Sequence, residues 1–385
     1  MTAITIPRES PLIIPDIMKA HWKSKEPFHL IGEPSTVKSA LVKQTAEEIS
    51  VEENDGREFV EWSKLTLSKK EEVNKNPEKY FIFEDLRASE TDIGELRLQN
   101  INNGEKYITY KYNLLFDTYS KPDSKGVLFF DEMNLASNMI KAQFYKVYND
   151  RSIGDLPISD EILICSAGNE SSQVRDVVQD SVALTTRRGN YFIDPLTSEE
   201  FISYGIKTGI NNSILGYLAF SPQDVHLLDY NLTDSIGQPC VRTWEKLSNI
   251  LNSNDDLDIS IKSVISRGLI GPAISTKFTS FMKLEKSIKL EDVIKNPDII
   301  KDVKELQVVY AIVTGLLSKF KQGDEKLFGV VCKVAINIKE EIGVYILRMI
   351  KNIISINRFR KLALEGDYKE DFDKCYKKFG DLLID

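Results

Sequence analysis

The chain has 385 residues, of which 42% are hydrophobic, so it is long enough for two domains that each bury a core. Its 58 acidic and 50 basic residues give a formal net charge of -8 at pH 7, which argues against a protein that coats nucleic acid. The four cysteines are widely separated and form no CxxC pair. This spacing predicts reduced thiols and argues against a disulfide framework or a Cys/His metal site.

The sequence also argues against a membrane protein. The first 15 residues lack the basic region and long apolar run of a signal peptide. No stretch of about 18 apolar residues occurs anywhere in the chain. We therefore expect a cytoplasmic protein.

Short apolar runs separated by polar or helical segments predict an α/β domain. Fully apolar runs of this length are typical of strands that are buried on both faces of a parallel sheet. They predict a five-stranded, mainly parallel sheet, followed after Pro195 by segments with helical periodicity. The runs are 28–31, 80–83, 126–130, 162–166 and 191–193.

An inserted β-hairpin is predicted at about 93–113. Alternating segments flank Asn102, Asn103 and Gly104, which are turn-forming residues. Three tyrosines, Tyr107, Tyr110 and Tyr112, make the hairpin a candidate for contact with a partner. Packing at the edge of a sheet explains them equally well, since tyrosine is an ordinary strand residue.

A phosphate-binding loop is predicted where the first strand passes into a helix. The segment GEPSTVKS has the strand and helix context of a Walker A loop, in which backbone N–H groups surround phosphates. It departs from GxxxxGKS at Val37 and has Ser35 where a glycine is usual, so this loop alone is a weak signal. The candidate nucleotide-binding residues are Gly32, Glu33, Pro34, Ser35, Thr36, Val37, Lys38 and Ser39.

The loop gains support from the segment GVLFFDEMN. Its apolar run delivers Asp131 and Glu132 to the carboxyl end of a strand, where α/β sheets bind ligands. In phosphoryl transfer, Asp131 and Ser39 would serve Mg²⁺, and Glu132 would orient the attacking water. The pairing of both motifs predicts a Mg-ATP site.

Polar residues follow the next two apolar runs as well. Asn169 ends the run ILICSAGN and could bind the γ-phosphate and the water through its carboxamide. Arg187 and Arg188 precede the run at 191–193, and a guanidinium from a neighbouring subunit can stabilise the transferred phosphoryl group. An arginine pair is also common on a solvated surface, so the pair carries little weight alone.

Together, GEPSTVKS, GVLFFDEMN, ILICSAGN, TTRRGNYFI and PCVRTWEKL resemble five ordered motifs of AAA+ ATPases, and most closely those of the MoxR branch. The resemblance covers about residues 10–285. It implies an AAA+ nucleotide-binding domain at 1–198, an α-helical lid at 199–285 and a C-terminal helical extension at 286–385. It also implies that Arg242 is the sensor 2 arginine, and it favours Arg188 over Arg187 as the arginine finger.

The resemblance further implies an ATPase that assembles into a homo-oligomeric, hexameric ring. Such a ring would act as a chaperone that remodels a protein partner, for example one of the von Willebrand factor A type. Two alternatives stay open: a nucleotide-binding scaffold with little hydrolysis, and a nucleic-acid motor, against which the acidic balance stands. Arg151 could make a further contact across the subunit boundary, or be an ordinary surface arginine.

Overall fold

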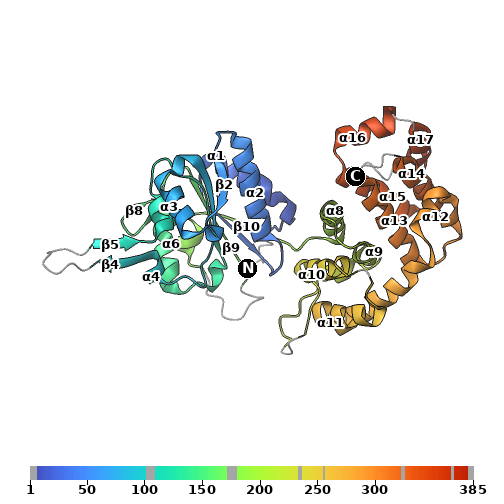
Figure 1. The fold of residues 1–385 in the computed structure, drawn as a ribbon, viewed down its shortest axis with the longest axis horizontal. Helices are drawn as coiled ribbons and strands as arrows, with labels where there is room; N and C mark the ends of the chain where they lie inside the picture. The colour runs from blue at the N-terminus through green and yellow to red at the C-terminus, as the bar shows by residue number, and fades with distance from the viewer. Residues whose placement is uncertain are drawn as a thin grey trace, which may run out of the picture. The chain divides into compact units, whose positions relative to one another are not determined.

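The computed structural model describes residues 7–100, 109–170, 180–232, 236–254, 256–321, 326–365 and 368–379. The chain divides into two compact units, Met1–Pro195 and Leu196–Asp385. Within the described residues, the first unit contains all of the strands and the second is helical (Figure 1). The predicted α/β domain with a helical region after it is confirmed. The subdivision of the helical region into lid and extension stays a prediction.

A six-stranded parallel sheet forms the middle of the first unit. The strand order is β10-β1-β9-β6-β3-β2, and every adjacent pair is parallel. Five strands cover the predicted runs, and the sixth, β2, was not predicted because its sequence EFVE is short and half charged. The strands are β1 (Phe28–Gly32), β2 (Glu58–Glu61), β3 (Tyr80–Arg87), β6 (Lys125–Asp131), β9 (Ile162–Gly168) and β10 (Gly189–Ile193).

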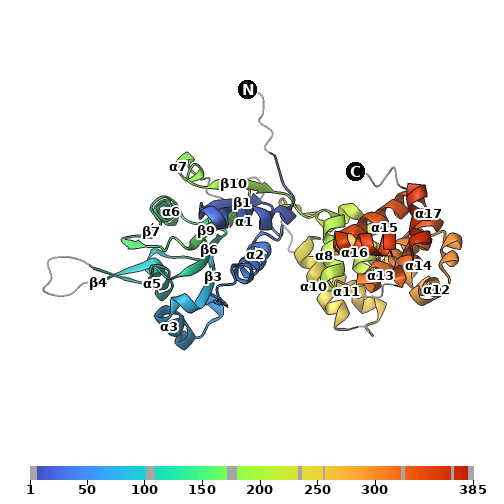
Figure 2. The same cartoon turned by 90° about the horizontal axis from the view of Figure 1, so that it is seen from above.

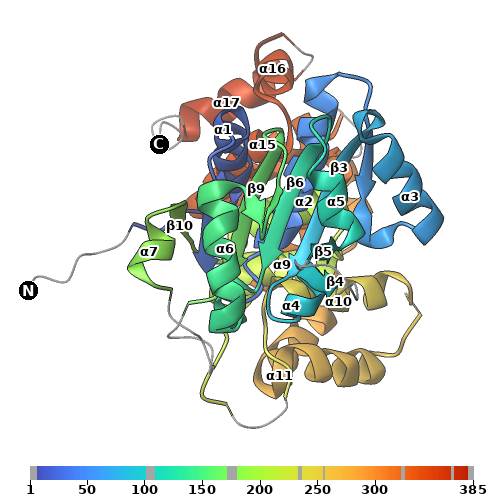
Figure 3. The same ribbon diagram turned by 90° about the vertical axis from the view of Figure 1, so that its left-hand side faces the viewer.

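Helices cover both faces of this sheet, as a sheet with apolar residues on both faces requires. On β6, Val127 and Phe129 pack toward α1 and α2, whereas Leu128 and Phe130 belong to the core that includes α5 and α6. Figure 3 shows α5 and α6 in front of the central strands. The helices are α1 (Ile14–Ser24), α2 (Lys38–Glu53), α3 (Leu67–Lys75), α4 (Ile93–Leu96), α5 (Leu114–Tyr119), α6 (Asn138–Asp150) and α7 (Val182–Thr185).

The predicted hairpin is present as an antiparallel pair, β4 (Arg97–Asn100) and β5 (Thr109–Tyr112). It extends from the first unit as Figure 2 shows. Its predicted turn residues and Tyr107 lie outside the described residues. Of the remaining tyrosines, the Tyr112 hydroxyl accepts a hydrogen bond from the Asp155 N–H at 3.1 Å. Asp155 lies between β7 (Ser152–Ile153) and β8 (Leu156–Pro157), a second small antiparallel pair.

The second unit is built from amphipathic helices around its own core. Trp244, Tyr217 and Phe278 are fully buried there and their rings contact one another. α11 changes direction at Gly271, which has a φ of 78° and precedes Pro272. The helices are α8 (Ser198–Thr208), α9 (Asn212–Phe220), α10 (Val241–Asn252), α11 (Ile259–Leu284), α12 (Leu290–Lys295), α13 (Leu306–Lys321), α14 (Leu327–Asn337), α15 (Glu340–Ile353), α16 (Ile356–Arg360) and α17 (Lys369–Phe379).

Two expectations from the sequence concern the cysteines and membrane-spanning helices. The four cysteines, Cys165, Cys240, Cys332 and Cys375, are buried with free thiols. Among the described residues, no helix is long and apolar enough to cross a membrane.

Candidate active site

The predicted phosphate loop connects β1 to α2 at the carboxyl edge of the sheet. Ser35 and Val37 both adopt left-handed backbone conformations, with φ of 63° and 54°. These are the two positions where the loop departs from the usual glycines. A left-handed conformation costs a residue with a side chain about 1–2 kcal/mol, and it is rare for a β-branched residue. The loop therefore keeps a glycine-like backbone without the glycines.

Lys38 begins α2 and turns its ammonium group back into the loop. Its Nζ donates to the carbonyl oxygens of Gly32 and Glu33 at 3.0 and 2.9 Å, and to Thr36 Oγ1 at 2.8 Å. The residue is only 7% exposed. Val37, the N-cap of α2, offers no side chain to cap the helix, so the positive end of its dipole faces the loop. The ammonium group of Lys38 and the N-terminus of α2 thus both place positive charge at the loop.

Gly32 is required by a close approach of two strands. A Cβ atom on Gly32 would lie 2.3 Å from the carbonyl oxygen of Ile193 on β10. Real atoms do not approach so closely, so a larger residue would separate β1 from β10 and shift the loop. The candidate residue Pro34 lies between Glu33 and Ser35 in the loop and is half-buried.

Ser39 and Asp131 are brought into direct contact, although 91 residues lie between them. The Ser39 hydroxyl donates to Asp131 Oδ2 at 2.5 Å, and Asp131 Oδ1 accepts from the Glu132 N–H at 2.8 Å. The contact follows from the sheet order, because β9 alone separates β1 from β6 and all three strands are parallel. The carboxyl ends of these strands therefore meet at one edge.

Glu132 occupies a left-handed turn directly after β6, with φ of 54°. Its Oε2 accepts a hydrogen bond of 2.6 Å from the Ser89 hydroxyl, and Ser89 follows the carboxyl end of the neighbouring strand β3. Sequence reasoning missed Ser89, because a serine in a loop is ordinary until the sheet order places it next to a carboxylate.

Asn169 follows β9, between the ends of β1 and β6. Its backbone N–H donates to Asn134 Oδ1 at 2.9 Å, and Asn134 lies in a short 3₁₀ helix, Met133–Leu135, just after Glu132. The Asn134 Nδ2 atom is buried and has no partner among the described residues. A Cβ on Gly168 would lie 2.9 Å from Asn134 Oδ1, so this contact also requires glycine. Asn134 is a second residue that the sequence reasoning missed.

A third carboxylate, Asp85 on β3, lies on the same face as Asp131. Burial raises the pKa of Asp85 to about 6, and the neighbouring charge of Asp131 adds to this shift. Its Oδ1 has no partner among the described residues. The carboxyl edge of the sheet therefore combines a cationic loop with several closely spaced acidic groups.

The two candidate finger arginines lie at the opposite edge of the sheet. β10 begins at Gly189, which is paired with Phe28, the first residue of β1, whereas the phosphate loop follows the last residue, Gly32. Five strand residues correspond to about 16 Å. Neither arginine is therefore near the phosphate loop of its own chain.

The two arginines differ sharply in exposure. The side chain of Arg188 is 0% exposed and forms an ion pair with Asp180. Arg187 is half-buried, and its guanidinium donates to the Ala183 carbonyl oxygen in α7 and lies 5.6 Å from the centre of the Tyr145 ring. The resemblance favoured Arg188 as the finger, but a side chain that is fully enclosed in its own domain is poorly placed to contact a neighbouring subunit.

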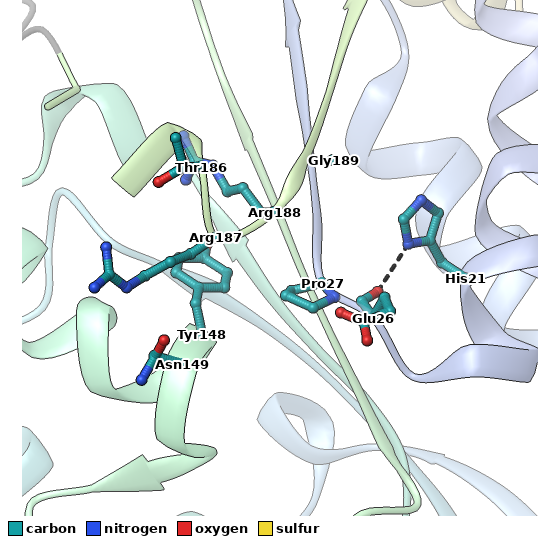
Figure 4. A pocket seen from close by; sticks show the side chains of 9 residues that line it. All are labelled: His21, Glu26, Pro27, Tyr148, Asn149, Thr186, Arg187, Arg188 and Gly189. Carbon is teal, nitrogen blue, oxygen red and sulfur yellow. Dashed lines mark hydrogen bonds between the residues drawn. The ribbon is translucent and has the colours of Figure 1, made fainter. Parts of the chain in front are cut away.

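Both arginines line a cavity of about 430 Å³ at this edge, together with His21, Tyr148 and Asn149. Figure 4 shows the two side chains leaving their shared turn in different directions. His21 is held by two hydrogen bonds of 2.8 Å, to the Glu26 carbonyl oxygen and the Tyr191 hydroxyl.

A buried polar chain lies between this cavity and β1. The Tyr148 hydroxyl donates to Ser166 Oγ at 2.7 Å, and Ser166 Oγ lies 2.8 Å from His29 Nδ1. Burial lowers the pKa of His29 well below its usual range, and nearby positive charges add to the effect. His29 is therefore neutral, and its hydrogen bond to Ser166 joins β1 to β9 inside the sheet.

The remaining candidates lie elsewhere. Arg242 is exposed in the first turn of α10, in the second unit, so its role at a nucleotide stays a prediction. Arg151 donates to the Ser159 carbonyl oxygen at 2.8 Å and also to the Ile162 carbonyl oxygen, and burial lowers its pKa. It is therefore a half-buried structural residue of its own domain.

The residues at the carboxyl edge fit a nucleoside triphosphate with a divalent cation. Hydroxyl and carboxylate oxygens are the ligands that Mg²⁺ prefers, and one or two protein ligands suffice when phosphates supply others. Ser39 and Asp131 form such a pair. Among the described residues, no group of three or more His, Cys, Asp or Glu side chains could hold a metal ion by itself.

No family model and no curated protein matches the chain. Solved structures to which it is similar include a protein from Cytophaga hutchinsonii described as an ATPase, with 11% identity, 88% of each chain covered and a TM-score of 0.32. A RuvB mutant from Thermotoga maritima has 14% identity over 81% of this chain and 82% of that one, with a TM-score of 0.30. The replication initiator DnaA, bound to AMPPCP and single-stranded DNA, has 14% identity over 96% of each chain and a TM-score of 0.36.

Proposed function

We propose that this chain is an AAA+ ATPase that hydrolyses Mg-ATP, resembles the MoxR branch and acts as a ring. The observation that carries the proposal is the contact of 2.5 Å between Asp131 and Ser39, the residue that follows Lys38. A strand-to-helix turn with an incidental Lys-Ser pair would have no reason to meet a carboxylate from another strand end. The contact joins the two motifs that a nucleotide site needs.

Each residue at this edge has a chemical role in the proposal. The loop N–H groups and Lys38 bind the phosphates, and Ser39 and Asp131 hold Mg²⁺, which supplies charge stabilisation on the phosphate oxygens when bound. Glu132 accepts a proton from the attacking water, whose oxygen adds to the γ-phosphorus as the bond to ADP breaks. The Asn169 carboxamide orients that water.

The transferred phosphoryl group also needs a cation that stabilises its developing negative charge. Lys38 is committed to the loop, and both arginines of the pair lie at the far edge of the sheet. We propose that Arg187 enters the site of the adjacent subunit in a homo-oligomeric, hexameric ring, since Arg188 is enclosed. Arg242 would contact the nucleotide as the sensor 2 residue of the lid.

Remodelling of a protein partner, such as one of the von Willebrand factor A type, is proposed from the resemblance to the MoxR branch. The β4–β5 hairpin is the candidate contact surface. A cytoplasmic location is consistent with four buried free thiols, which suit a reducing compartment.

The alternative with a specific observation in its favour is a nucleotide-binding scaffold. Two non-glycine residues with positive φ in the phosphate loop could hinder the close approach that catalysis needs. Both proposals predict nucleotide binding, so only turnover distinguishes them.

The deciding experiment compares the chain with its Glu132→Gln variant. We expect the wild type to release phosphate from ATP, and the variant to bind ATP normally but lose turnover by about 10³-fold, because the amide cannot accept the proton. Steady-state phosphate release and fluorescent-nucleotide binding measure the two quantities. Exposed Glu47→Gln, on α2, is the matched control and should change neither. Wild-type binding without turnover would favour the scaffold.

A further inference from the structure

A buried cluster of three charges lies beside the candidate finger. Lys141 of α6 donates to Asp180 Oδ1 at 2.8 Å, and Arg188, just before β10, pairs with Asp180 Oδ2. The side chains are 6%, 15% and 0% exposed, in the order Lys141, Asp180, Arg188. Each carboxylate oxygen thus receives one cation, and neither pair is weakened by full exposure to solvent.

The cluster spans the segment that carries Arg187. Asp180 precedes α7, and Arg188 follows Arg187, so one carboxylate connects the two ends of the segment 180–188. Its pairing with Lys141 attaches the same point to α6. Ser181, the N-cap of α7, is also hydrogen-bonded to the Tyr145 hydroxyl of α6. α7 has only four residues, too short to be stable without such attachments.

Arg188 makes further contacts inside the domain. Its Nε donates to Asn190 Oδ1 at 3.3 Å, and its guanidinium lies 5.4 Å from the centre of the Tyr148 ring. Asn190 in turn donates to the carbonyl oxygens of Thr185 and Arg188 at 2.7 and 3.0 Å. The planar, multidentate guanidinium is suited to hold several groups at once. Arg188 therefore fixes the turn between α7 and β10.

We propose that Lys141, Asp180 and Arg188 form a clamp, a set of positioning residues that presents Arg187 to the adjacent subunit. The inference rests on the proposed function for its catalytic consequence. Arg187 lies on the segment that this cluster anchors, and its own contacts, to Ala183 and the Tyr145 ring, are to the anchored segment and to α6. A catalytic group that is displaced by about 1 Å can lose about 10²-fold in rate. Loss of the cluster therefore acts on turnover through Arg187.

The first arm of the test measures ATP turnover of the full chain. We expect Arg187→Ala to lower kcat by about 10³-fold or more and Asp180→Asn by about 10²-fold, both with little change in the KM for ATP. Arg188→Lys keeps a cation beside Asp180 but loses the planar group that also contacts Asn190 and Tyr148, so kcat should fall less than in Asp180→Asn. A kcat of Asp180→Asn near the wild-type value overturns the proposal.

The second arm needs no turnover, so it separates this inference from the proposed function. Hydrogen exchange of the nucleotide-free chain should show faster exchange in residues 180–190 of Asp180→Asn, with β1 and β6 unchanged. Arg187→Ala is the control and should leave this segment protected. Unchanged exchange in Asp180→Asn contradicts the clamp, even if ATP is hydrolysed. If wild type fails to hydrolyse ATP, the proposed function fails, while the exchange result still decides the clamp.

A destabilised variant does not block the test. Should Asp180→Asn fail to give a cooperative thermal transition, the pair Arg188→Lys and Arg188→Ala replaces it. Protection of residues 180–190 in the lysine variant and its loss in the alanine variant support the clamp. Equal exchange in the two variants overturns it.

Discussion

The two edges of the parallel sheet present charge in opposite ways. At the carboxyl edge, Lys38 is hydrogen-bonded to neutral loop oxygens, and Ser39 contacts Asp131. At the amino edge, Arg188 is paired with the carboxylate of Asp180. Lys38 and Arg188 are equally buried, and a buried charge must be hydrogen-bonded or paired to be tolerated. The difference lies in the partners: neutral oxygens leave the charge of Lys38 available for the phosphate that we propose it binds, whereas the carboxylate neutralises the charge of Arg188.

The largest effect that tests this difference is expected from Lys38→Ala. The substitution removes the ammonium group that faces the loop, so turnover should fall by about 10³-fold or more and nucleotide affinity should fall with it. Nucleotide titration and phosphate release measure both. Lys43→Ala is the control on the same helix, because Lys43 pairs with Glu61 away from the loop. A Lys38→Ala protein with normal affinity would break the comparison at its carboxyl edge.

The next effect contrasts the neighbouring arginines by stability. Arg188→Ala leaves Asp180 with one cation instead of two and removes an enclosed side chain, so we expect a loss of about 3 kcal/mol in the free energy of unfolding. Arg187→Ala should change it by less than about 1 kcal/mol, as for other positions outside the core. Urea unfolding of the two variants measures the difference. Equal losses would show that the enclosure of Arg188 does not matter.

A pH-dependent effect extends the comparison to β3, whose last residues lie at the carboxyl edge of the sheet. Burial raises the pKa of Glu84 to about 7, although the Ser63 N–H donates to its Oε2 at 2.9 Å. The folded state therefore binds a proton that the unfolded state has released above pH 4.5, and stability falls as pH rises toward 7.

Glu84→Gln should remove this dependence. The variant should equal the wild type near pH 4 and be more stable by about 2 kcal/mol at pH 8, because the amide is never charged. Urea unfolding at several pH values measures the difference. Glu58→Gln, on the exposed edge strand β2, should follow the wild-type profile. A constant difference between wild type and Glu84→Gln across pH would contradict the assignment.

The smallest effect concerns the strained loop itself. Val37→Gly removes a β-branched side chain from a left-handed conformation, which costs about 1–2 kcal/mol, and the greater chain entropy of glycine offsets about 0.5–1 kcal/mol of the gain. A net stabilisation of about 0.5–1 kcal/mol should appear in urea unfolding. Ala40→Gly, in the regular part of α2, should instead destabilise by about 1 kcal/mol. If both variants destabilise, the conformation of Val37 is not a source of strain.

Several elements of this protein were predictable from its sequence by local rules. Five apolar runs predicted five strands, because buried parallel strands are continuously hydrophobic. Three of the runs also located Gly32, Asp131 and Asn169 at strand ends. The Walker A spacing predicted a loop with Lys38 and Ser39 at the start of a helix. β2 escaped this reasoning, since a short strand at a sheet edge does not need an apolar sequence.

Tertiary structure alone decided which side chains meet. The sequence contained Ser39 and Asp131 but not their contact, which follows from the strand order that places β9 between β1 and β6. The hydrogen bonds of Ser89 to Glu132 and of Asn134 to Asn169 likewise depend on the strand order. The difference in burial between Arg187 and Arg188 is also tertiary, because two adjacent and chemically identical residues do not reveal it in the sequence. Spacing along the chain specifies local conformation, whereas burial and contact depend on how distant segments pack.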